Sequence, residues 1–120
     1  GADLYLMPSR FEPCGLTQMQ AMRYGAIPVV TAVGGLVDTV TDADHHRHGT
    51  GFVAGRAATE DVLATLFRAQ RRVSDRRRRT AIQKRGMTID WSWRDPAREY
   101  LALYDELAAN TRIRSESPLR

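Results

Sequence analysis

The residues best suited to chemistry lie near the N-terminus, in a loop that follows a short apolar run. Gly15 permits a close approach of the backbone to a ligand, and the free N–H groups of Leu16 and Thr17 at a helix start attract an anion such as phosphate. Glu12 supplies a carboxylate that accepts hydrogen bonds from hydroxyl groups. Recognition of a phosphate and of a polyol side by side predicts a site for a sugar nucleotide.

A simpler interpretation of the same loop stays open at this point. A single glycine before a helix is common, and Gly15 is then only a turn residue. Glu12 would form an ion pair with Arg10 at the surface, and neither side chain would touch a ligand. Spacing alone does not distinguish the two interpretations.

The elements around this loop predict a βαβ unit. Leu4–Met7 and residues 27–30 are apolar runs typical of buried strands, and Pro28 is expected near the start of the second strand, where no ladder hydrogen bond is lost. Gly25 is a candidate C-cap for the helix between them, which is predicted by the spacing of Leu16, Met19 and Met22. The two strands should be parallel, which places the loop beyond the carboxyl end of the first, where open α/β sheets bind ligands.

The rest of the chain predicts a third strand and further helices. Gly34-Gly35 precedes a short helix, residues 41–50 are a polar surface loop, and residues 51–54 are a strand candidate. Three longer helices follow, the second of them Arg-rich and ending near Gly86. Apolar stripes indicate the first and the last of these helices, at positions Val62, Leu63, Leu66, Phe67 and Val73, and at positions Ala97, Leu101, Tyr104 and Ala108.

The fold class is therefore α/β, with a parallel sheet and flanking helices. Three strands are too few for a finished doubly wound sheet, so we expect the missing strands upstream and the chain to be part of a longer protein. We assign residues 1–109 to one partial domain that includes the C-terminal helices. Residues 110–120 have almost no apolar content, and we expect them to be a disordered tail.

The composition is that of an ordinary globular protein, since the 120 residues are 42% hydrophobic and 27% charged. No apolar run approaches the roughly 18–20 residues that span a bilayer, which argues against an integral membrane protein. The single cysteine cannot form an internal disulfide, and no signal-peptide pattern is present at the start of the sequence. We therefore expect a cytoplasmic protein with no membrane partner.

The positive charge is concentrated in one segment. Lys and Arg total 18 against 14 Asp and Glu, which gives a formal net charge of +4. Arg68–Arg85 contains nine basic residues and one acidic residue, so that the remainder has a net charge of −4. Because the segment lacks interleaved aromatic residues for base stacking, we interpret it as a solvated helix face and expect no nucleic-acid partner.

Other candidate residues carry less specific signals. Cys14 has no Cys–His pairing signature for nucleophilic catalysis, and a lone cysteine is more often a small buried hydrophobe. Trp91 and Trp93 precede an amphipathic helix and are expected to be core anchors rather than a stacking surface for sugar rings. The polar loop has no second cluster of ligands close in sequence, so we expect it to be solvated and without metal, although it holds His45, His46 and His48.

Two motifs together resemble bacterial glycogen synthases and plant starch synthases. The first is Pro8-Ser9-Arg10-Phe11-Glu12-Pro13-Cys14-Gly15-Leu16-Thr17-Gln18, which is followed by Ala21-Met22-Arg23-Tyr24-Gly25 and Pro28-Val29-Val30. The second is Val33-Gly34-Gly35-Leu36-Val37-Asp38-Thr39-Val40. The resemblance is strong over residues 1–54 and returns weakly at Asp90-Trp91-Ser92-Trp93.

This resemblance implies a retaining glucosyltransferase with two Rossmann-like domains in the GT-B arrangement. Such an enzyme moves glucose from ADP-glucose to the non-reducing end of an α-1,4-glucan and needs no cofactor or metal. The chain then resembles part of the C-terminal, donor-binding domain, which works with an N-terminal domain missing here. By position, Glu12 is the catalytic candidate and binds the donor glucose hydroxyls, while the backbone of Cys14 and Gly15 approaches the same sugar. The amides of Leu16 and Thr17 hold the distal phosphate.

One position departs from the broader superfamily, in which a second Glu often follows eight residues after the first. Gln20 occupies that position, which favours the ADP-glucose branch and removes a two-carboxylate acid/base scheme. The family's Arg and Lys that neutralise the leaving phosphate lie upstream of residue 1, so we expect the chain alone to be inactive. Two alternatives stay open: another retaining nucleotide-sugar glycosyltransferase, and a non-catalytic binding module whose basic helix docks an acidic partner.

Overall fold

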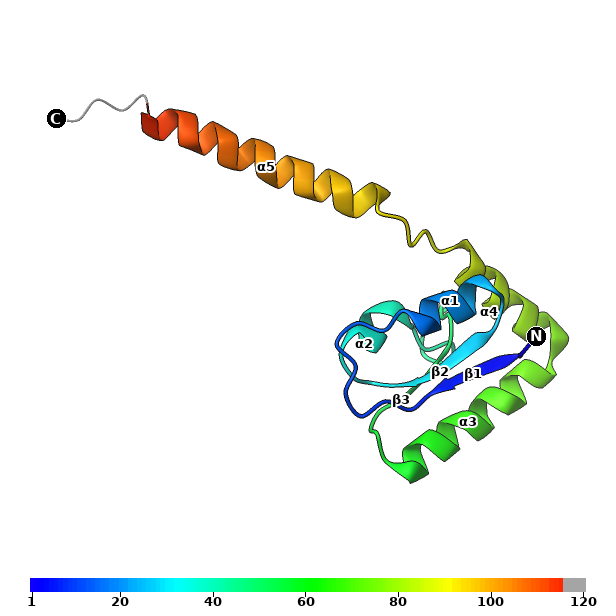
Figure 1. The fold of residues 1–120 in the computed structure, drawn as a ribbon. Helices are drawn as coiled ribbons and strands as arrows, with labels where there is room; N and C mark the ends of the chain where they lie inside the picture. The colour runs from blue at the N-terminus through cyan, green and yellow to red at the C-terminus, as the bar shows by residue number, and fades with distance from the viewer. Residues whose placement is uncertain (116–120) are drawn as a thin grey trace. The chain divides into compact units, whose positions relative to one another are not determined.

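The computed structural model describes residues 1–115, with side chains described through residue 109. It divides the chain into two compact units, Gly1–Ile89 and a second unit that begins at Asp90. The first unit contains all three strands and four of the helices, coloured from blue to yellow-green in Figure 1. The second contains a single helix.

The sheet consists of three parallel strands in the order β1-β2-β3. They are β1 (Leu4–Met7), β2 (Ile27–Thr31) and β3 (Phe52–Ala54). Leu4 lies opposite Ile27, and Val29 lies opposite Phe52. The predicted α/β class and the parallel βαβ unit are confirmed, and the carboxyl ends of all three strands meet at one edge of the sheet.

Pro28 lies at the second position of β2, the central strand, where a proline is unusual. The N–H of Ile27 donates to the carbonyl of Asp3, on the β1 side. Because successive residues of a strand present their N–H groups to opposite neighbours, the nitrogen of Pro28 faces the β3 side. Pairing with β3 begins only at Val29, so the missing N–H costs the ladder no hydrogen bond.

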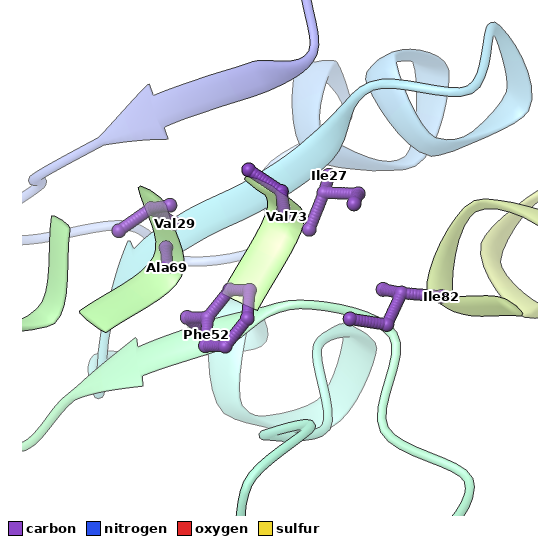
Figure 2. Close-up of a cluster of buried hydrophobic side chains, with 6 residues drawn as sticks. All are labelled: Ile27, Val29, Phe52, Ala69, Val73 and Ile82. Carbon is purple, nitrogen blue, oxygen red and sulfur yellow. The ribbon is translucent and has the colours of Figure 1, made fainter. Parts of the chain in front are cut away.

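Helices cover both faces of the sheet, as in Figure 1. On one face α3 (Thr59–Ser74) and α4 (Arg76–Thr88) enclose the cluster drawn in Figure 2, in which Phe52 and the side chains of β2 meet both helices. On the other face α1 (Thr17–Arg23) and α2 (Gly35–Thr39) pack Met22 and Leu36 against Val30. Alternate residues of β2 therefore serve opposite cores, as the two-residue period of a strand requires.

The prediction that Gly25 ends α1 is confirmed: it directly follows the C-cap residue, Tyr24, and has a φ of 83°. Its N–H donates to the carbonyl of Met22, and the N–H of Ala26 donates to the carbonyl of Ala21. This pair of hydrogen bonds is a Schellman motif, which needs a residue in the left-handed region. The chain is thereby turned directly from α1 into β2.

Two details of α3 and α4 differ from the sequence predictions. The buried positions of α3 are Thr65, Ala69 and Val73, whereas Phe67 of the predicted stripe is 60% exposed, because it lies about 160° around the helix from the buried row. Helix α4 ends at Thr88 rather than near Gly86. Gly86 is buried inside the helix, where its missing side chain lets α4 approach Met22 closely.

The second unit consists of α5 (Arg94–Ser115) and the residues before it. The described side chains of α5 are exposed, and Trp93, Tyr100 and Tyr104 form a row with ring centroids 6.5 and 6.3 Å apart. Trp93 is 73% exposed within this unit, since a single helix has no core of its own to bury it. Helix α5 also extends into the segment 110–120 for which we expected disorder, because Ala108 and Ala109 favour its propagation. Residues 116–120 lie outside the described residues.

Candidate functional site

The loop between β1 and α1 carries the predicted site residues and begins at the carboxyl end of β1. Glu12 is half-buried, and within the described residues its carboxylate has no hydrogen bond or ion pair. Arg10 is exposed and does not pair with it. The surface ion pair that we considered as the simpler interpretation of this loop is thus not formed.

The two sequence motifs meet through their backbones at this loop. The N–H of Gly35 donates to the carbonyl of Glu12 over 3.1 Å. Gly34 has a φ of 46°, and a side chain there would overlap the Glu12 carbonyl. A side chain at Gly35 would overlap the backbone of Cys14. The glycine pair is therefore needed for close backbone approach, whereas the sequence indicated only a chain break before a helix.

Gln18 is buried with 0% exposure and links the same two segments. Its side-chain amide donates to the carbonyl of Gly15 over 2.9 Å and to the hydroxyl of Thr39 over 3.0 Å. The Thr39 hydroxyl in turn donates to the carbonyl of Gly35 over 2.8 Å. Gln18 was not among the residues predicted for the site, although its position four residues before Met22 places it on the buried side of α1.

Of the remaining predicted residues, Cys14, Leu16 and Thr17 lie on the outside of the loop, and Gly15 lies on its buried side. Leu16 is the N-cap of α1 and is 62% exposed, so its assignment to the buried stripe of that helix was wrong; Gln18 occupies the stripe instead. Cys14 is exposed, which also contradicts the description of a small buried hydrophobe. Thr17 is exposed, while Gly15 is buried and has a φ of 73°. One short loop thus brings Glu12 and the residues that follow it together.

A hydroxyl from β2 also holds this loop. The side chain of Thr31, the last residue of β2, is buried and donates to the carbonyl of Ser9. The loop is therefore attached at its start to the central strand and near its end to Gln18. Anchors of this kind hold the loop on the rigid part of the fold.

The polar segment 41–50 is only partly a solvated loop. Asp42 is buried and forms a bidentate ion pair with Arg68, with both N–O distances between 2.8 and 2.9 Å. Burial raises the pKa of Asp42, but hydrogen bonds from Arg68 and from the backbone N–H groups of Val53 and Asp44 outweigh it and lower the pKa to about 2. Arg68 is therefore partly buried against the ion-paired aspartate rather than fully solvated on a helix face.

The histidines of this segment, His45, His46 and His48, are exposed. Among the described residues no group of three or more potential ligands is arranged to hold a metal ion. In the same part of the chain, no helix combines the length and the apolar character needed to cross a membrane.

The loop and the glycine pair lie within the part of the chain that a known family model matches. The model of the family described as "Glycosyl transferases group 1" matches residues 1–86. The chain belongs to the group 1 glycosyl transferases. The matched range contains the sheet, the Glu12 loop and the helices packed on them.

Among curated proteins, this glycosyl transferase chain is similar to glycogen synthases. It is 54% identical over 109 residues to the glycogen synthase of Anaeromyxobacter sp. (strain Fw109-5), which is 91% of the chain and 23% of that protein. It is 49% identical over 119 residues to the glycogen synthase of Rhodopseudomonas palustris (strain BisB18), which is 96% of the chain and 24% of that protein. The chain thus spans about a quarter of the length of these relatives.

Solved structures of other proteins share the fold. The catalytic domain of starch synthase IV from Arabidopsis thaliana, bound to ADP and acarbose, is 38% identical with a TM-score of 0.78, over 87% of this glycosyl transferase chain and 22% of that one. Sucrose-phosphate synthase from Thermosynechococcus elongatus is 27% identical with a TM-score of 0.67, over 91% of this chain and 26% of that one. The three-stranded sheet is therefore part of a GT-B glycosyltransferase domain.

Proposed function

We propose that this chain is the donor-binding portion of an ADP-glucose-dependent glycogen or starch synthase. The full enzyme transfers glucose from ADP-glucose to the non-reducing end of an α-1,4-glucan with retention of configuration. The observation that carries the proposal is the unpaired Glu12 carboxylate in a loop seated on Gly34 and Gly35, in a chain about half identical to glycogen synthases. A cytoplasmic location follows from this function.

Glu12 is the proposed catalytic and sugar-binding residue. A carboxylate that accepts hydrogen bonds from sugar hydroxyls contributes roughly 1.5–3 kcal/mol of binding free energy. Its negative charge also favours the oxocarbenium-like character that develops at the glucose ring in the transition state. The lack of a competing partner among the described residues leaves its oxygens free to accept those hydroxyls.

The backbone after Glu12 completes the proposed donor site. Cys14 and Gly15 approach the glucose ring through their main-chain atoms, so the Cys14 thiol has no assigned chemical step. The N–H groups of Leu16 and Thr17 hold the distal phosphate of ADP-glucose, which is an anion suited to such donors. The ADP bound in the Arabidopsis starch synthase structure supports a nucleotide diphosphate as the leaving group.

The chain by itself is proposed to be inactive. Electrostatic stabilisation of the charge that develops on a leaving group usually contributes more to the rate enhancement than any other effect. The resemblance places the Arg and Lys that supply it upstream of residue 1, together with the acceptor domain. The partners of this chain are accordingly the donor, the glucan and the N-terminal domain of the same enzyme.

Donor preference tests the proposal. The full-length enzyme that contains this chain would be assayed for glucose transfer to glycogen with ADP-glucose and with UDP-glucose. We expect kcat/KM to favour ADP-glucose by at least about tenfold, and the new linkages to be α-1,4. Equal use of both donors would favour another nucleotide-sugar glycosyltransferase. No transfer, together with strongly salt-dependent binding of an acidic protein, would favour the binding module.

A further inference from the structure

Burying the polar side chain of Gln18 costs free energy of folding. Its side chain is completely buried, and its Oε1 atom has no hydrogen-bond partner in the described structure. An apolar side chain of similar length would fill the same volume without the unpaired Oε1 atom. An unsatisfied buried group of this kind calls for a reason other than packing.

The donors of the Gln18 amide are directed at backbone atoms of the proposed site. The nitrogen lies 2.9 Å from the carbonyl oxygen of Gly15 and 3.4 Å from that of Cys14. Carbonyl oxygens only accept hydrogen bonds, so the nitrogen rather than Oε1 must face them. The orientation of the Gln18 amide is therefore determined by the loop.

These hydrogen bonds also fix the direction of the next N–H group along the chain. In a trans peptide the C=O and N–H bonds point in opposite directions, and none of the peptide bonds between described residues, that between Gly15 and Leu16 included, is cis. Drawing the carbonyl of Gly15 inward to the buried Gln18 therefore turns the N–H of Leu16 outward, to the exposed side of the loop. Within the described residues, that N–H has no backbone partner.

Gln18 is itself held from the opposite side by α2. Its amide donates to the hydroxyl of Thr39 over 3.0 Å, and that hydroxyl donates to the carbonyl of Gly35 over 2.8 Å. Gly35 in turn donates its N–H to the carbonyl of Glu12 over 3.1 Å. The bonds form a continuous path from the Gly15 carbonyl through Gln18, Thr39 and Gly35 to Glu12.

We propose that Gln18 is a positioning residue, which together with Thr39 sets the orientation of the Gly15–Leu16 peptide relative to Glu12. The inference rests on the proposed function, because the positioned groups are those that bind the donor. Gln18 touches no substrate in this account. Its effect reaches ADP-glucose only through the loop backbone, while the glucan acceptor is not affected.

The test compares variants of the full-length enzyme in steady-state kinetics. Gln18→Met keeps the length of the side chain and removes its donors. We expect donor KM to rise and kcat/KM for ADP-glucose to fall by about tenfold, the size of one neutral hydrogen bond, with glucan KM within about twofold of wild type. Gln70→Met, at an exposed position of α3, is the matched control and should leave all constants within about twofold.

Thr39 provides a second pair of variants, which tests the positioning role even if Gln18→Met does not fold. Thr39→Val removes the hydroxyl, whereas Thr39→Ser keeps it. We expect donor KM to rise in Thr39→Val and to stay close to that of wild type in Thr39→Ser. The effects of Gln18→Met and Thr39→Val on donor KM should be less than additive in the double variant, because both substitutions break the same path of hydrogen bonds.

Three outcomes would overturn the inference. A purely structural role would lower kcat through loss of folded enzyme and leave donor KM unchanged. Donor KM within about twofold of wild type for both Gln18→Met and Thr39→Val would contradict the positioning role while leaving the proposed function intact. A wild-type enzyme that transfers no glucose from any nucleotide sugar would overturn the proposed function, and this inference with it.

Discussion

The Cα atom of Gly34 lies so close to the carbonyl oxygen of Glu12 that any side chain at position 34 would overlap it. The backbone conformation of Gly34, with a φ of 46°, is also one that other residues rarely adopt. The turn before α2 and the loop after β1 are therefore one structural unit. A substitution in the turn should therefore displace the Glu12 carboxylate.

Gly34→Ala is expected to impair donor binding. The new methyl group must push the Glu12 backbone away. The alanine must also adopt a strained φ, and this strain alone costs on the order of 1–3 kcal/mol of stability. We predict a lower Tm and a higher KM for ADP-glucose in the full-length enzyme.

Gly55→Ala is the matched control for this substitution. Apart from its own atoms and those of its two chain neighbours, no atom lies within 4 Å of the position that its Cβ would occupy, and Gly55 does not have a positive φ. Its Tm and donor KM should stay close to those of wild type. Equal behaviour of the two variants would contradict the close contact between Gly34 and Glu12.

Alkylation of Cys14 should block donor binding. The thiol is exposed and lies two residues after Glu12, so an attached carboxamidomethyl group would occupy space next to the proposed position of the glucose ring. We predict that iodoacetamide inactivates the full-length enzyme and that saturating ADP-glucose slows the reaction. Cys14→Ser should retain measurable activity and resist the reagent. Equal labelling rates with and without ADP-glucose would contradict this placement of the loop.

The ion pair between Asp42 and Arg68 should make stability depend on pH. The pKa of Asp42 is lowered to about 2 in the folded protein, below its ordinary value of about 3.9. The pair therefore stabilises the folded protein fully above about pH 4–5, and this stabilisation is lost as the pH falls through 4 toward 2. Its full contribution to the free energy of unfolding is on the order of 2 kcal/mol.

Variants at two aspartates test this dependence. The Tm difference between wild type and Asp42→Asn should be largest near pH 7 and should shrink as the pH approaches 2. Asp61→Asn breaks an ion pair with the exposed Arg56 and should have a much smaller effect at every pH. A Tm difference for Asp42→Asn that does not change with pH would show that the carboxylate charge contributes nothing.

Local patterns in the sequence were sufficient to predict much of the fold. Leu4–Met7 is a strand with the predicted bounds, and the central strand extends the predicted run by a single residue, Thr31. Gly25 ends α1 because only a residue tolerant of positive φ can close a Schellman motif. These features depend on neighbours in the chain, which a sequence displays directly.

Features that depend on distant contacts were missed. Asp42 was assigned to a solvated loop because its neighbours are polar, and its burial depends on Arg68, which lies 26 residues away. Gln18 was overlooked because apolar spacing favoured Leu16 for the buried stripe, while the partner that makes a buried amide tolerable is Thr39, 21 residues away. The local periodicity of apolar residues contains no information about such distant pairs.

The role of Glu12 in the donor site is the central claim, and Glu12→Gln tests it most directly. The substitution keeps the size of the side chain and one acceptor oxygen but removes the negative charge. Steady-state kinetics of the full-length enzyme with ADP-glucose should show kcat falling by more than donor KM rises, because the charge interacts most strongly with the transition state. Changes in kcat and donor KM of less than about twofold, the size expected for a surface residue, would contradict the account.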